Sequence, residues 1–240
     1  MSVELTTGWL AQHLLATDTL ALPSALAMQI WLHLGWSVVL ACVGANLVGR
    51  WRPARPGKLD AWQWGVALVL ALWTWVPGPY SPAYWLGLAF QAPSIASVLL
   101  CDALLRGRFF PTRSGASINE LPNPAALALA LAGVVLGWAL LLDTLALLPV
   151  QLYAWGFSPA CVGLVMVAAL IPWLVGVGRN PAGRSRVWIL PLAVVVFVVW
   201  RLPSGNVWDA VLDPWLWLLL HVYVARALGR FVRRSYAERR

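Results

Sequence analysis

The sequence predicts an all-α fold, a polytopic bundle of about seven transmembrane helices. Of its 240 residues, 61% are hydrophobic and 11% are charged, whereas soluble domains carry about 25% charged residues. The apolar residues stand in runs long enough to cross a bilayer, and the basic residues lie beside the ends of those runs, as topology signals do. This placement of a net charge of +8 indicates a lipid bilayer as partner and argues against nucleic acid.

The clearest run covers 123–149 and is the fourth predicted span. Asp143 is its one ionisable residue. About 20 apolar residues, each rising 1.5 Å along a helix, cross a hydrocarbon layer of about 30 Å. The run therefore predicts a transmembrane helix.

Three apolar spans precede it, at about 25–48, 61–76 and 83–105. Basic loops follow the first and the third. A Pro/Gly turn at 77–82 separates the second from the third, because prolines withhold backbone donors and end helices.

Three spans follow it. The fifth starts after the connection 151–159 and ends near Val177, the sixth covers about 187–200, and the seventh covers about 214–228. The sixth is short for a crossing, and tilt or local thinning of the bilayer would accommodate it.

The basic residues also predict the orientation. If successive loops alternate sides, every Lys and Arg except Arg201 falls on one side, and the positive-inside rule places the N-terminus outside and the C-terminus in the cytoplasm. Three parts are predicted: an interfacial segment (1–20) with Trp9 at headgroup level, a seven-helix transmembrane domain (21–230), and a basic cytoplasmic tail (231–240). The preference for arginine over lysine indicates a bacterial inner membrane protein from a GC-rich genome.

A weak similarity relates the first three spans to the last three. Leu47-Val-Gly-Arg and Leu174-Val-Gly-Val-Gly-Arg each open a basic loop, a short span and a turn. Two triplets around the fourth helix would form a three-plus-one-plus-three plan, as parallel repeats do in small sugar carriers. Chance alignment of apolar segments is the alternative.

Polar residues interrupt the middle of the third span, where Gln91, Pro93, Ser94 and Ser97 lie. Pro93 frees a backbone carbonyl one turn back, and serine or glutamine can bond the exposed groups. Interrupted helices of this kind form substrate sites in carriers. Polar packing between helices explains the same residues.

Ionisable residues within spans are functional candidates, because burying them in a bilayer is costly. Asp143 is expected either to line a cavity, to pair with Arg201, or to cap a helix near the interface. Asp102 lies four residues before Arg106, the spacing of a helical ion pair.

His33 and His221 lie at similar predicted depths in the first and last spans. Two histidines so placed are what an axially ligated haem b would need. A neutral histidine bonded to a neighbouring helix is the alternative. The cysteines lie in separate spans without CxxC spacing, so no metal site is predicted.

Two classes of function remain. The first is a non-catalytic subunit or assembly factor of a larger inner-membrane complex, whose partners would be other membrane-protein subunits. The second is a small-solute or ion transporter that uses Gln91, Pro93, Ser94, Ser97 and Asp143. A haem- or quinone-binding electron-transfer subunit is a third hypothesis. The sequence contains no hydrolase or phosphate-binding motif, which argues against a membrane enzyme.

Overall fold

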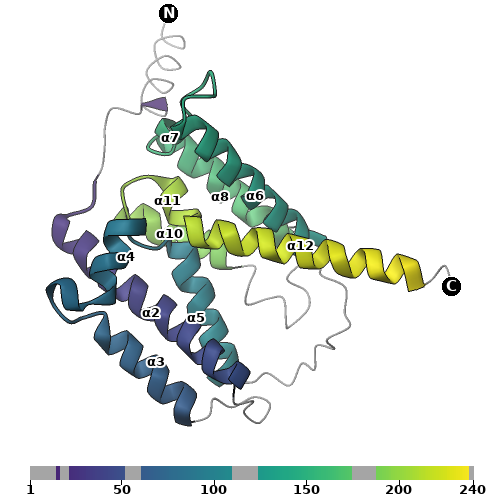
Figure 1. The fold of residues 1–240 in the computed structure, drawn as a ribbon. Helices are drawn as coiled ribbons and strands as arrows, with labels where there is room; N and C mark the ends of the chain where they lie inside the picture. The colour runs from purple at the N-terminus through teal and green to yellow at the C-terminus, as the bar shows by residue number, and fades with distance from the viewer. Residues whose placement is uncertain (1–14, 17–21, 52–60, 110–123, 175–187, 238–240) are drawn as a thin grey trace, which may run out of the picture.

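Every regular element that the computed structural model describes is a helix (Figure 1). The described residues are 15–16, 22–51, 61–109, 124–174 and 188–237. The helices are α2 (Ala25–Trp51), α3 (Ala61–Trp73), the 3₁₀ turn η1 (Gly78–Tyr80), α4 (Pro82–Phe90), α5 (Ile95–Phe109), α6 (Pro124–Thr144), α7 (Leu152–Trp155), α8 (Pro159–Leu174), α10 (Ile189–Trp200), α11 (Val207–Val211) and α12 (Pro214–Ala237). The all-α prediction is confirmed for this part of the chain.

Three described helices are long and apolar enough to cross a membrane. They are Ala25–Trp51 in α2, Ala126–Thr144 in α6 and Pro214–Arg233 in α12. Three further apolar helices, α3, α8 and α10, are shorter than a full crossing. Each predicted span thus contains helix, and the third consists of two helices, α4 and α5, which meet at the interruption around Pro93.

The predicted terminal segments are described only in part. The N-terminal interfacial helix falls on 1–14, which lies outside the described residues. Most of the predicted basic loops, within 52–60, 110–123 and 175–187, also lie outside them. At the other end α12 continues to Ala237, so the first part of the predicted tail is helical.

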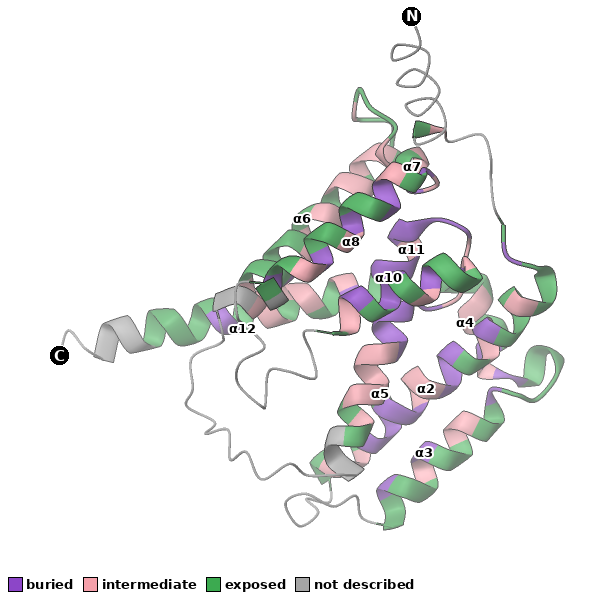
Figure 2. Cartoon of the chain, turned by 180° about the vertical axis from the view of Figure 1, so that it is seen from behind, coloured by how far each residue is buried: buried purple, intermediate pink, exposed green. Residues whose placement is uncertain are grey.

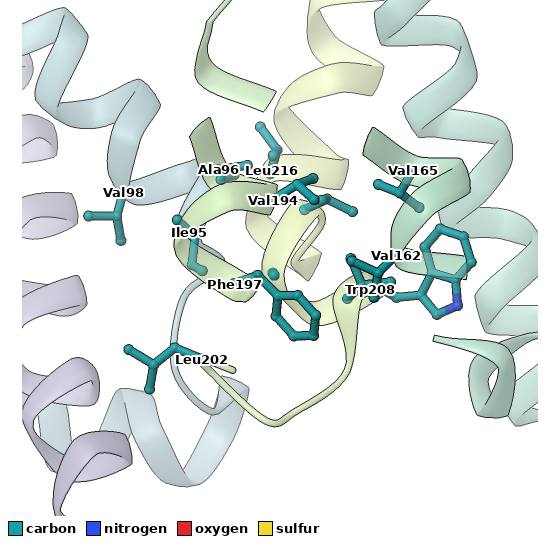
Figure 3. Close-up of a cluster of buried hydrophobic side chains, with 14 of the residues drawn as sticks. Ile95, Ala96, Val98, Val162, Val165, Val194, Phe197, Leu202, Trp208 and Leu216 are labelled. Atoms are coloured by element: carbon teal, nitrogen blue, oxygen red, sulfur yellow. The ribbon is translucent and has the colours of Figure 1, made fainter. Parts of the chain in front are cut away.

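The core forms around α10. Packing proceeds from α3 to α2, α5, α10 and α8 in turn, and α11 lies against α5, α8 and α10. Ala193, Val194 and Phe197 of α10 are fully buried. Their cluster draws side chains from α2, α5, α8, α11 and α12, and Figure 3 shows Ile95, Val162 and Trp208 close to Phe197. This apolar cluster includes Ile95 at the start of α5 and Val207 at the start of α11, so it fixes the positions at which both helices begin.

A second unit is the pair α6 and α12, which pack on each other (Figure 1). The indole N–H of Trp217 donates to the carbonyl oxygen of Val134 at 3.1 Å. Trp217 and Leu220 lie over Gly137 and Gly133, whose missing side chains allow close approach. Few of the other described side chains on these two helices are buried (Figure 2), as expected for helices that lipid surrounds.

The two helix triplets do not pack alike. The third helix of the first triplet is broken, and its α5 part packs on α2. The third helix of the second triplet, α12, is continuous and packs on α6. The three-plus-one-plus-three plan therefore stays a prediction without support from the packing.

The contact of Trp217 with Gly137 predicts a difference between two glycine substitutions. A Cβ at Gly137 would overlap the indole, whereas a Cβ at Gly163 in α8 meets no described atom within 4 Å. Gly137→Ala should lower stability by about 1–3 kcal/mol through overpacking. Gly163→Ala should be neutral or stabilise by about 1 kcal/mol, because alanine favours helix over glycine. Thermal unfolding in detergent measures both, and equal shifts would contradict this packing.

Candidate functional site

The third predicted span breaks at Gln91. Its N–H still donates to the carbonyl oxygen of Gly87 at 3.0 Å, but its backbone turns to φ 61° and ψ −156°. α5 then starts after Ser94, whose Oγ accepts a hydrogen bond from the N–H of Ser97 at 3.0 Å. Pro93 explains the break, because proline lacks a backbone donor and disfavours helix in the residue before it.

Two tryptophans of α2 bind the carbonyl groups that the break exposes. The indole N–H of Trp31 donates to the carbonyl oxygen of Pro93, and that of Trp36 donates to the carbonyl oxygen of Gln91, both at 3.0 Å. Gly35 lies between them, and an added Cβ there would come within 2.7 Å of the Pro93 ring. α2 therefore holds the break through two indole hydrogen bonds and through the close approach of Pro93 at Gly35.

Asp213 joins the break to α12. It is 8% exposed, and its Oδ2 accepts from the N–H of Ser94 at 2.8 Å while its Oδ1 accepts from the N–H of Leu216 at 2.7 Å. One carboxylate thus caps the first turns of two helices, α5 and α12. Negative charge at a helix N-terminus is favourable, because the unpaired N–H groups and the helix dipole are positive there.

A second hydrogen-bond network centres on Tyr153 of α7. Its hydroxyl donates to Asp209 Oδ2 at 2.7 Å, and the Ser204 hydroxyl donates to the same oxygen at 2.5 Å. The N–H of Tyr153 donates to Asp143 Oδ2 at 2.7 Å, and its carbonyl accepts from the side-chain amide of Asn206 at 2.9 Å. Burial, and next the hydrogen bond to Asp209, raise the pKa of the phenol above its usual value. Tyr153 therefore stays a neutral donor at physiological pH.

A cleft of about 770 Å³ opens between these two networks. It is bounded by α2, α4, the end of α6, α7 and the segment that leads from α10 through α11 to α12. Its polar lining residues are Gln29, Gln91, Thr144, Tyr153, Ser204, Asp209 and Asp213. The described lining contains two carboxylates and no basic side chain, so the cleft suits neutral polar or cationic molecules.

The structure brings together only part of the predicted substrate site. Gln91 lines the cleft, but Pro93, Ser94 and Ser97 are buried behind it. Asp143 lies beside the cleft and caps α7 through the N–H of Tyr153.

The ion pairs differ in part from expectation. Asp102 and Arg106 form the predicted pair at 2.7 Å. The guanidinium of Arg201 lies 5.3 Å from the centroid of the Phe197 ring. Its predicted pairing with Asp143 is not among the salt bridges of the described residues, because that carboxylate caps α7 instead.

The two histidines have separate partners. His33 Nδ1 donates to the carbonyl oxygen of Thr74 at 2.6 Å. His221 Nδ1 donates to the carbonyl oxygen of Trp217 at 2.8 Å, and its Nε2 accepts from the indole N–H of Trp138 at 3.2 Å. Both ring nitrogens of His221 are thus engaged within the α6–α12 pair, so its ring would have to give up a hydrogen bond to ligate iron. The haem hypothesis stays a prediction.

Sequence reasoning did not find the cleft residues Gln29, Tyr153 and Ser204. Nothing in their local sequence separates them from other polar residues near helix ends. Asp213 carried a usable signal, since an aspartate followed by proline marks a helix start. Among the described residues, no group of three or more His, Cys, Asp or Glu side chains is placed to hold a metal. Comparison of the chain with protein families, with curated proteins and with solved structures finds no match.

The double capping by Asp213 predicts a large effect of an isosteric change. Asp213→Asn leaves one acceptor oxygen for two N–H groups, so it should lower stability by about 1–2 kcal/mol. Asp102→Asn is the matched control, since it removes a half-exposed pair on α5 and should cost at most about 0.5 kcal/mol. Thermal unfolding followed by the fluorescence of the 17 tryptophans compares them. Equal losses of stability in the two variants would mean that capping two helices stabilises the protein no more than the surface ion pair does.

Proposed function

We propose that this is a small-solute carrier of the bacterial inner membrane with seven crossings, the N-terminus outside and the C-terminus in the cytoplasm. α2, α6 and α12 have the length and composition of crossings, and the basic loops follow the positive-inside rule. The 13 residues of α3 and the 12 of α10 rise only about 20 Å. These helices therefore cross with help from their flanking residues or from a locally thinned bilayer.

The observation that carries the proposal is the broken third span beside a polar cleft. α4 spans nine residues, so the break lies about 13 Å along the helix axis from its start, deep within the span. Irregular backbone at such depth is tolerated where protein buries it or where it lines a water-filled cavity. Gln91 meets both conditions. Its carbonyl oxygen accepts a hydrogen bond from Trp36 within the protein, and the residue also lines the cleft.

The backbone of Gln91 supports a binding role. Its φ of 61° and ψ of −156° lie in a region that essentially only glycine occupies, at a cost of about 1–3 kcal/mol for other residues. Strained residues of this kind concentrate at ligand sites. The side chain of Gln91 is exposed within the cleft wall, where its amide can both donate and accept hydrogen bonds.

The proposed solute is small, polar and either neutral or positively charged. A volume of about 770 Å³ is within the usual range of ligand pockets, about 300–1,000 Å³. Asp209 and Asp213 bring negative charge to two sides of the cleft, and Phe90 brings an aromatic ring that packs at a tilt of 58° against Trp215, with centroids 4.8 Å apart. Aromatic rings and carboxylates together favour cations over anions.

Gln91→Gly separates binding from folding. Glycine adopts the same backbone conformation without strain, so the variant should fold at least as well while losing the amide that faces the cleft. Solute affinity should fall about tenfold, the value of one or two hydrogen bonds. Isothermal titration of the purified protein measures this change once the solute is known. Gln151→Ala is the control, because that exposed glutamine makes no capping bond; an equal loss there would contradict a role for the cleft.

The solute itself is sought by transport into proteoliposomes. Choline, putrescine, neutral amino acids and an anionic control, succinate, would be offered in radiolabelled form. Uptake of a cationic or neutral compound, with no uptake of succinate, is the expected result. Uptake of succinate alone would contradict the charge of the cleft.

A second candidate, the accessory subunit of a membrane complex, is favoured by the α6–α12 pair. Its outer apolar side chains, such as Val135 and Leu219, are more than half exposed, and lipid or a partner helix would cover them. Purification in mild detergent followed by mass spectrometry tests this candidate. A stoichiometric membrane partner supports the subunit, and a lone protein supports the carrier. A Soret absorption band in the same sample would support the haem hypothesis for His33 and His221.

A further inference from the structure

A second hollow lies on α12, away from the solute cleft. It is a groove of about 570 Å³ along the middle and the C-terminal part of the helix. Its described lining includes Leu219, Val222, Arg226, Arg230 and Arg233, all of them exposed. Because these residues recur at intervals of three and four, they form one continuous stripe on the helix.

The stripe faces away from the packed side of α12. Trp217, Leu220 and His221 make the contacts with α6. At 3.6 residues per turn, Leu219, Val222 and the arginines fall on the opposite side. The described lining of the groove therefore lies on the side of α12 that points away from α6.

The groove changes from apolar to basic along its length. Leu219 and Val222 lie in the apolar part of the helix, and Arg226, Arg230 and Arg233 follow over about 10 Å. No salt bridge joins these arginines to a carboxylate among the described residues. A Cβ at Gly229, beside the stripe, would meet no described atom within 4 Å, so no described side chain covers the helix there.

We propose that this groove binds one anionic phospholipid at the cytoplasmic surface. The three guanidiniums bind the lipid phosphate, for which paired N–H groups of arginine are well suited. An acyl chain lies along Leu219 and Val222. A lipid fits better than a soluble phosphate compound because the groove continues from the arginines onto apolar residues of a helix long enough to cross a membrane. This site is independent of the solute cleft.

Native mass spectrometry of the detergent-purified full chain tests the proposal. The probes are phosphatidylglycerol and phosphatidylcholine with identical acyl chains. Wild-type protein should retain one phosphatidylglycerol more tightly than any phosphatidylcholine. A combined change of Arg226, Arg230 and Arg233 to Gln should weaken that binding by about fivefold for each arginine removed, since one basic residue at an anionic surface contributes about that factor. Equal retention of the two lipids by wild-type protein would overturn the proposal.

Two controls distinguish lipid binding in the groove from a general effect of positive charge. Arg50→Gln removes an exposed arginine at the end of α2 and should leave lipid retention unchanged; an equal loss would overturn the site. The single change Arg230→Gln keeps the test open if the triple variant does not fold. Arg230→Lys preserves the positive charge but lacks the paired N–H donors of the guanidinium, so it should bind phosphatidylglycerol more tightly than Arg230→Gln and less tightly than the wild type. Equal affinity of the Lys and Gln variants would overturn a phosphate contact at this position.

Discussion

A helix that breaks inside a membrane leaves backbone N–H and C=O groups that lipid cannot bind, and each unsatisfied group costs several kcal/mol. At the break between α4 and α5 these groups find partners on other helices. Trp31 and Trp36 of α2 donate to two carbonyls, and the Asp213 carboxylate accepts from the N–H of Ser94. The arrangement of α2, α4, α5 and α12 follows from this requirement, because each must be placed where it can supply or receive one of these bonds.

The same requirement explains the position of the cleft. Asp213 is held between the first turns of α5 and α12, and Asp209 is held by Tyr153 and Ser204. These bonds fix the walls on two sides of the cleft and leave Gln91 projecting from a third. The carboxylates are thus structural first, and their remaining lone pairs and negative charge are what a bound solute would meet. These two carboxylates are the reason why we propose a solute carrier ahead of an accessory subunit.

Much of this fold follows from local sequence. Apolar runs with basic flanks predict where the helices lie, and Pro93 predicts the break. What local sequence does not contain is the pairing across the break, since Ser94 and Asp213 are 119 residues apart. Asp143 shows the same limit. The cost of burying a carboxylate in a bilayer makes it a candidate functional residue, but its hydrogen bond to the N–H of Tyr153 depends on how the chain turns into α7. Likewise the partners of His221 depend on the close approach of α6 and α12, which only the packed structure reveals.

The proposed carrier and its orientation require that the break be reached by water from the outer face of the membrane, and accessibility of residue 91 tests this requirement most directly. In a background with Cys42, Cys101 and Cys161 changed to alanine, Gln91→Cys would be exposed to a membrane-impermeant maleimide in intact cells. Val135→Cys is the control, because Val135 is 66% exposed on α6 where lipid would cover it. Rapid labelling at position 91 with none at position 135 is the predicted result. No labelling at position 91, or labelling only after the cytoplasmic side is opened, would contradict the account.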